Sequence, residues 1–224
     1  MIAWTLLDTA EIPNGEGHLR LMRRAAEYSI MSSAIELMNS RLSGSEKALA
    51  TLALERLGDR PDLRVLIGGL GMGFTLRSAL GQLGPRALVA VAELVPAVIG
   101  WARGPLAALF EGSLTDPRVS LHEADVADMI EAARAGYDAI LLDVDNGPGG
   151  LGRAANDGLY SMDGLRAARR ALAPGGMLAV WSAGPNADFA RRLGRCGFRV
   201  DEVRVRANGA GRGARHIIWL ASPA

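Results

Sequence analysis

Several short stretches of the sequence combine an apolar strand with residues that could bind a ligand at its end. Leu63 to Ile67 reads as a buried strand, and the glycines Gly69, Gly71 and Gly73 follow directly. Glycine has no side chain, so its backbone can turn sharply and approach a ligand closely. The helix expected from Thr75 would offer free N–H groups to an anionic group. The run is not a phosphate-binding P-loop, because no Gly-Lys-Ser/Thr follows, and it lacks the usual dinucleotide spacing.

Acidic residues end the next three expected strands. A carboxylate at Glu93 can accept hydrogen bonds from both hydroxyls of a ribose. Asp125 could accept from an adenine amino group, or it could cap the helix that follows. Asp143 ends the fourth strand, beside the place where a transferable group would lie. We expect Leu94 and Val126, the neighbours of the first two acids, to line the same ligand.

Strands and helices alternate in the part of the chain that must position these residues. Five apolar strands are expected at Leu63–Ile67, Ala87–Ala92, Val119–His122, Ala139–Leu142 and Met177–Trp181. Strands without polar alternation are buried on both faces, which indicates a parallel sheet covered by helices. Phe198–Arg206 and His216–Ala221 are expected to form an antiparallel hairpin. The predicted fold is therefore α/β, a doubly wound, mostly parallel, seven-stranded sheet with an antiparallel C-terminal hairpin.

The helices and the front segment are less regular. Pro96–Leu109 reads as one helix, and a second helix should run from an N-cap at Ser45 to a stop at Gly58. Ahead of it, Ile2–Thr9 and His18–Arg24 alternate like the strands of a hairpin. We expect a small N-terminal β segment over residues 1–42 and one larger domain over residues 43–224.

The composition excludes several classes of protein. The chain has 224 residues with 25 basic and 24 acidic side chains, so bulk positive charge gives no indication of nucleic-acid binding. Cys196 is the single cysteine, and the three histidines are far apart in sequence, so no metal site is expected. No leader and no apolar run long enough to cross a bilayer is visible, which predicts a cytoplasmic protein without a membrane or nucleic-acid partner.

Together these motifs resemble the class I S-adenosylmethionine-dependent transferases, and more narrowly the spermidine synthase branch. The similar stretches are Gly69–Arg77, Val91–Pro96, Asp116–Val119, Tyr137–Asp143, Leu159–Ser161 and Leu172–Gly176. The resemblance covers residues 60 to 185, and the front segment resembles a shortened form of that family's N-terminal β domain. It implies a Rossmann-like fold, S-adenosyl-L-methionine or its decarboxylated form as donor, a small-molecule amine or hydroxyl acceptor, and a homodimer.

The sequence departs from that family where the chemistry takes place. The family's loop aspartate is Met72 here, which removes a charge that would repel the carboxylate of ordinary S-adenosylmethionine. The family's Tyr-His-Glu segment corresponds to Gly44–Glu46, without the histidine. The second aspartate of its Asp-x-x-Asp pair corresponds to Asn146, which cannot act as a base. Asp143 and Asp145 remain the candidates for that role.

Two further residues have alternative interpretations. Tyr160 could orient the acceptor, or it could be a packed core tyrosine. Glu46 could reach the donor or acceptor, or it could be a first-turn acid stabilised by the helix dipole. The leading expectation is methyl transfer from S-adenosylmethionine to a small molecule. The alternatives are aminopropyl transfer from decarboxylated S-adenosylmethionine to a diamine, and a non-catalytic protein that binds adenosyl ligands.

Overall fold

The chain folds into two sheets. The computed structural model describes residues 2–13, 17–144, 147–148, 158–208 and 212–224. A four-stranded antiparallel sheet has the order β1-β2-β3-β4, and a seven-stranded sheet has the order β10-β11-β9-β8-β5-β6-β7. The small sheet consists of β1 Thr5–Glu11, β2 His18–Arg24, β3 Glu27–Ser32 and β4 Ile35–Asn39. The large sheet consists of β5 Arg64–Gly68, β6 Leu88–Glu93, β7 Val119–Glu123, β8 Tyr137–Leu142, β9 Leu172–Ser182, β10 Phe198–Asn208 and β11 Arg212–Pro223.

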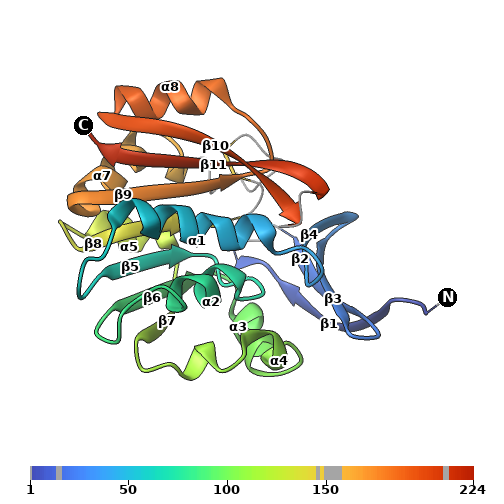
Figure 1. Cartoon of the computed structure of the whole chain (residues 1–224). Helices are drawn as coiled ribbons and strands as arrows, with labels where there is room; N and C mark the ends of the chain where they lie inside the picture. Colours follow the sequence, from blue (N-terminus) through green and yellow to red (C-terminus); the bar gives the residue numbers. More distant parts are fainter. Residues whose placement is uncertain (1, 14–16, 145–146, 149–157, 209–211) are drawn as a thin grey trace.

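The large sheet confirms the expected architecture. Strands β5 to β9 pair in parallel, and β11 pairs antiparallel with β9 and β10 (Figure 1). Along β5, Val65 and Ile67 pack into the core on one face while Leu66 packs into the core on the other. Both faces are therefore buried, which explains why the strand sequences show no polar alternation.

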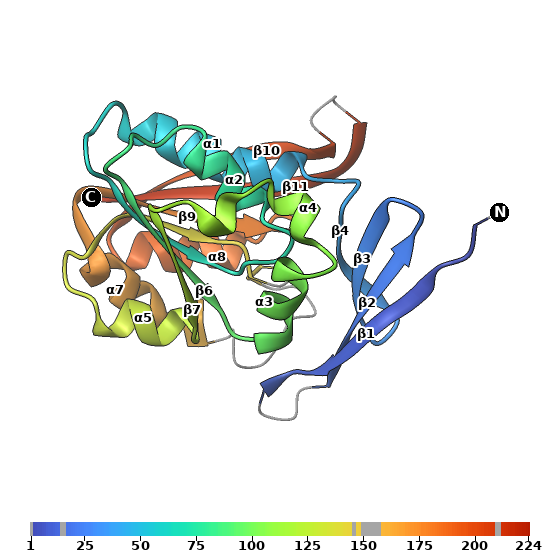
Figure 2. The ribbon, with the colours of Figure 1, turned by 90° about the horizontal axis from the view of Figure 1, so that it is seen from below.

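Helices cover both faces of this sheet. They are α1 Gly44–Leu57, α2 Phe74–Leu80, α3 Pro96–Arg103, α4 Ala107–Phe110, the 3₁₀ turn η2 Ser113–Thr115, α5 Val126–Ala132, α7 Met162–Ala171 and α8 Ala187–Arg195. Helices α1 and α2 pack on one face, whereas α5, α7 and α8 pack on the other (Figure 2). No helix among the described residues is long and apolar enough to span a membrane.

Two local expectations about the helices are wrong. The stretch from Pro96 is broken into α3 and α4 at Gly104-Pro105, because proline has no N–H to donate and restricts the residue before it. Ser45 is not the N-cap of α1; Ser43 occupies that position, and the Ser45 hydroxyl contacts Glu46 and His216 instead. The stop at Gly58 is confirmed, with a left-handed φ of 68°.

The N-terminal sheet extends the expected hairpin. Strands β1 and β2 pair antiparallel as predicted, and β3 and β4 add two strands that the sequence pattern did not indicate. Leu21 and Ile30 are fully buried in the same core as α1 and the face of the large sheet that α1 covers. The small sheet therefore contributes apolar side chains to this shared core.

Candidate active site

The glycine loop lies at the point where the order of the strands across the sheet reverses. Strand β5 pairs with β6 on one side and β8 on the other, and ligands bind at such switch points in doubly wound folds. The N–H of Gly69 donates to the carbonyl of Ala92 (2.9 Å), and the N–H of Asp143 donates to the carbonyl of Gly68 (2.9 Å). The loop is thus tied to the ends of both neighbouring strands.

Gly69 and Gly73 leave no space for a side chain in this loop. Gly69 has a φ of +92°, and a Cβ built there would lie 2.4 Å from the carbonyl oxygen of Asp143. Gly73, with φ +77°, would place a Cβ 2.4 Å from the ring of Phe110. Glycine is therefore required at both positions for two reasons, a left-handed backbone and the lack of space.

We expect Gly69→Ala to destabilise the protein more than Gly112→Ala. Gly112 has a similar φ of +81°, but a Cβ added to it would meet nothing within 4 Å, so alanine there carries the backbone strain without the clash. Thermal unfolding should show a loss of about 1 kcal/mol for Gly112→Ala and at least twice that for Gly69→Ala. Equal losses of unfolding free energy in the two variants would mean that the clash with the Asp143 carbonyl does not destabilise Gly69→Ala.

Both oxygens of the Glu93 carboxylate accept from backbone N–H groups, one in the glycine loop and one just before α3. Oε2 accepts from the N–H of Leu70 (3.0 Å) and Oε1 accepts from the N–H of Val95 (2.9 Å). The residue is only 8% exposed. These two bonds from backbone N–H groups fix the orientation of the carboxylate. Its contact with a ribose stays a prediction.

The other expected donor-binding residues lie around the same edge of the sheet. Asp125 is the N-cap of α5, where it accepts from the N–H of Ala127 (2.8 Å), in agreement with the capping interpretation. Val126 is buried against Gly68, and Leu94 is half-buried. Contacts of these residues with an adenine stay predictions.

Met72 does not support the charge argument drawn from it. Its side chain is 3% exposed and packs in the hydrophobic core. The replacement of an aspartate by Met72 therefore does not by itself shape the charge near a donor's amino-acid end. Neighbouring Gly71 lies under Met38 of β4, whose sulfur is 3.0 Å from a Cβ built on it.

Asp143 and Glu46 form a pair of carboxyl groups beside the loop. The hydroxyl of Thr75 donates to Oδ2 of Asp143 (2.6 Å) and lies 3.3 Å from the backbone carbonyl of Glu46. Burial raises the pKa of Asp143 to about 7, the negative charge of Glu46 adds to this rise, and the bond from Thr75 opposes it. Burial likewise raises the pKa of Glu46. Two carboxyl groups held this way are suited to a cation or to holding a proton near neutral pH.

Ser45 lies next to Glu46 and His216 lies next to Ser45, and the sequence did not indicate either as part of the site. The hydroxyl of Ser45 donates to Oε2 of Glu46 (2.8 Å) and lies 2.9 Å from Nδ1 of His216. His216 is on β11, 171 residues along the chain, so only the tertiary pairing of β11 with β9 brings it to α1. The family resemblance gave one indication, because it expects a histidine at the position of Ser45. In the structure the imidazole of His216 lies beside Ser45 instead.

Tyr160 is the remaining sequence-based candidate that the structure describes. It is 4% exposed, with its ring edge-on to Phe189 at 5.6 Å between centroids. Its role toward an acceptor stays a prediction. Asp145 and Asn146 lie outside the described residues. Within the described ranges, no three His, Cys, Asp or Glu side chains are placed to hold a metal ion.

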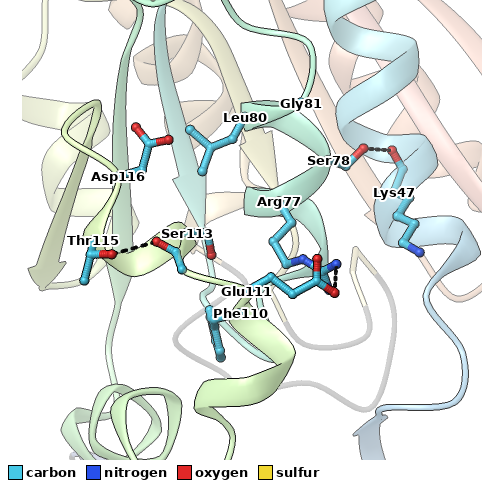
Figure 3. A pocket seen from close by; sticks show the side chains of 11 residues that line it. Lys47, Arg77, Ser78, Leu80, Gly81, Phe110, Glu111, Ser113, Thr115 and Asp116 are labelled. Carbon is cyan, nitrogen blue, oxygen red and sulfur yellow. Dashed lines mark hydrogen bonds and ion pairs between the residues drawn. The ribbon is translucent and has the colours of Figure 1, made fainter.

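An open groove of about 570 Å³ lies on the other side of α2 (Figure 3). Arg77 and Leu80 face it, whereas Thr75, about 200° away from Arg77 around the helix, faces Asp143. Across the groove Arg77 forms an ion pair with Glu111. The residues that line the groove include none of those at the carboxyl edge of the sheet.

Known proteins resemble this chain in sequence over part of its length. No family model matches it. Polyamine aminopropyltransferase 1 of Streptomyces coelicolor is 39% identical over 127 residues, 56% of this chain and 23% of that protein. The polyamine aminopropyltransferase of Mycobacterium tuberculosis H37Rv is 40% identical over 125 residues, 54% of this chain and 23% of that protein. The chain therefore spans about a quarter of the length of these curated relatives.

The structural comparison shows the fold. A spermidine synthase from Thermotoga maritima superimposes with a TM-score of 0.75 over 98% of this chain and 72% of that chain, at 18% identity. The chain has a spermidine synthase-like fold, which is a form of the class I S-adenosylmethionine-dependent methyltransferase fold.

These comparisons correct the leading expectation of methyl transfer. The curated relatives reported above are named polyamine aminopropyltransferases, and similar solved structures include spermidine synthases, so these findings favour the alternative of aminopropyl transfer over methyl transfer. The expectation failed because it relied on Met72 as a residue that faces the donor, whereas that side chain packs in the core.

Proposed function

We propose that this protein is an aminopropyltransferase that acts on a small diamine or polyamine with decarboxylated S-adenosylmethionine as donor substrate. The observation that carries the proposal is the carboxyl pair of Asp143 and Glu46 beside the glycine loop. The relatives named polyamine aminopropyltransferase support it.

The carboxyl pair suits the charges of these substrates. A diamine carries ammonium groups, and the decarboxylated donor ends in a bare ammonium. An ammonium near Asp143 would favour its ionised form and lower its pKa from about 7. Ordinary S-adenosylmethionine carries a carboxylate on the same chain, which two nearby carboxyl groups repel.

The transfer itself needs positioning and one proton acceptor. The acceptor ammonium first gives a proton to the carboxyl pair, which leaves a neutral amine with a free lone pair. That lone pair attacks the aminopropyl carbon that is bonded to the sulfonium sulfur, from the side opposite the C–S bond. The C–N bond forms, the C–S bond breaks, and its electron pair stays on sulfur as a thioether. Because the sulfonium is a good leaving group, alignment supplies much of the rate.

Each element of the site has a part in this scheme. The loop from Gly69 to Gly73 is suited to hold the donor's chain close to the backbone, and Glu93 its ribose. Asp143 lies at the end of the central strand β8, so it is the residue we assign to the attacking nitrogen. Thr75 fixes its carboxyl group through the 2.6 Å hydrogen bond.

A direct assay tests the proposal. The full chain is incubated with putrescine and decarboxylated S-adenosylmethionine, and mass spectrometry follows the triamine and methylthioadenosine. We expect both products in equal amounts, and no methylated amine when ordinary S-adenosylmethionine replaces the donor. Tight binding of adenosyl ligands without transfer to any of a panel of diamines would contradict the proposal and favour the non-catalytic alternative.

A further inference from the structure

The side chains of Glu46, Ser45 and His216 connect the carboxyl pair to strand β11. Ser45 is fully buried, and its Oγ is 2.8 Å from Oε2 of Glu46 and 2.9 Å from Nδ1 of His216. Strand β11 supplies the histidine, and α1 supplies the other two residues. The three groups form a continuous line of hydrogen bonds across two elements.

The single hydrogen of the Ser45 hydroxyl makes this line directional. If Glu46 is ionised, Ser45 donates to it, and His216 must donate its Nδ1–H to Ser45 Oγ. If Glu46 is protonated, it donates to Ser45, and Ser45 donates to an unprotonated Nδ1 of His216. The tautomer of neutral His216 is therefore tied to the charge of Glu46.

The packing around Glu46 and His216 moves the pKa values of the two groups toward each other. Glu46 is flanked by Lys47 on α1 and faces Asp143 at the end of β8, and burial raises its pKa. His216 packs edge-on to Trp181 of β9, 4.7 Å between ring centroids, and burial lowers its pKa. Raising the pKa of the carboxyl group and lowering that of the imidazole brings their proton affinities closer together, which favours proton exchange between them.

We propose that Glu46, Ser45 and His216 form a proton relay that carries the proton released by the acceptor amine away from the carboxyl pair. The relay rests on the proposed aminopropyl transfer. Protonated Glu46 gives its proton to Ser45 Oγ while Ser45 gives its own to Nδ1 of His216. The resulting imidazolium loses the proton on Nε2 to water, which His216 can reach because it is half-buried. Ser45 and His216 are positioning residues, because they act through Glu46.

Nitrogen NMR of the ligand-free protein tests the relay without any turnover. In the wild type, neutral His216 should be the Nδ1–H tautomer at pH 8 and shift toward Nε2–H as Glu46 becomes protonated. Ser45→Ala should abolish this change and leave the tautomer that is favoured in water. The matched control is Ser120→Ala, because His122 Nε2 lies 2.9 Å from Ser120 Oγ on exposed β7. That substitution should leave the spectrum of His216 unchanged.

Kinetics tests the same relay during catalysis. Ser45→Ala and His216→Gln should each lower kcat about tenfold, with KM for the donor changed less than about twofold. In His216→Ala, added imidazole should restore part of the lost kcat, which a merely structural role would not allow. Ser45→Thr, which keeps the hydroxyl, should retain more activity than Ser45→Ala.

The outcomes separate the relay from the enzymatic proposal. If the wild type transfers no aminopropyl group, the proposed function fails while the titration of His216 still reports on the hydrogen-bonded line. If transfer occurs but the His216 tautomer is constant between pH 5 and 8, the relay is wrong and the function stands. If Ser45→Ala does not fold, the titration of the wild type alone decides.

Discussion

Replacing Asp143 with asparagine should reduce kcat for aminopropyl transfer by about 10²- to 10⁴-fold, the range that loss of a general base costs. Asparagine keeps the shape and can still accept from Thr75, but it cannot take a proton. The KM for the donor should change little, because Glu93 and the glycine loop are intact. Steady-state kinetics with a diamine as acceptor gives both parameters.

The matched control for this substitution is Asp138→Asn. Asp138 lies on the same strand, β8, but at its other end, where it accepts from the backbone N–H of Arg64 (2.8 Å). Asp138→Asn should lower the stability of the protein and leave kcat unchanged. A comparable loss of kcat in both variants would show that Asp143 acts through the fold rather than through its proton.

Asp143→Asn should also stabilise the ligand-free protein above neutral pH. The pKa of Asp143 is about 7 in the folded chain, against an ordinary value of 3.8. Between these two values the unfolded chain ionises while the folded one keeps the proton, so the free energy of unfolding falls as pH rises. Above pH 7 the loss is constant. Asp143→Asn removes this loss.

Thermal unfolding at several pH values measures that gain. The difference in Tm between Asp143→Asn and the wild type should grow from pH 4 to pH 7 and then level off. Each kcal/mol corresponds to roughly 2–4 °C for a chain of this size. A difference that does not depend on pH would mean that the carboxyl group ionises normally in the folded protein.

Glu93→Ala should weaken binding of methylthioadenosine at least 100-fold. Hydrogen bonds from two ribose hydroxyls to a charged acceptor contribute about 1.5–3 kcal/mol each, and about 1.4 kcal/mol is a tenfold change. The substitution also leaves the N–H groups of Leu70 and Val95 without their acceptor. Isothermal titration calorimetry measures the affinity.

Two variants separate ligand contact from loop support. Glu123 is the register partner of Glu93 on β7 and is exposed, so Glu123→Ala should leave affinity unchanged. Glu93→Gln keeps an oxygen that can accept from one backbone N–H, so it should fold better than Glu93→Ala and yet bind weakly. Wild-type affinity in Glu93→Gln would overturn the assignment of the ribose to this carboxylate.

The repeating part of the fold could be predicted from the sequence because its signals are local. Buried strands such as Leu63 to Ile67 are apolar throughout, and the glycines and acids mark their ends. The break at Gly104-Pro105 was also local, but it was outweighed by the helical spacing of apolar residues around it. Strands β3 and β4 were missed because they are short and their pattern is mixed.

The site was predictable only where one segment determined it. Glu93 and Asp143 could be placed because each ends a strand at the same edge of a parallel sheet. The meeting of Ser45 with His216 depends on how β11 enters the sheet, and no local pattern reports this. The burial of Met72 depends equally on tertiary packing, so its side-chain direction could not be read from the loop motif.

Strand β11 lies between β9 and β10, although β10 precedes it in the chain. A segment synthesised late is therefore inserted into the interior of the sheet, and it delivers His216 to a helix made near the start. During translation α1 and the glycine loop can form well before that strand leaves the ribosome. A nascent chain should accordingly acquire the glycine loop first and the hydrogen-bonded line from Glu46 to His216 last, which release of stalled chains of graded length could resolve.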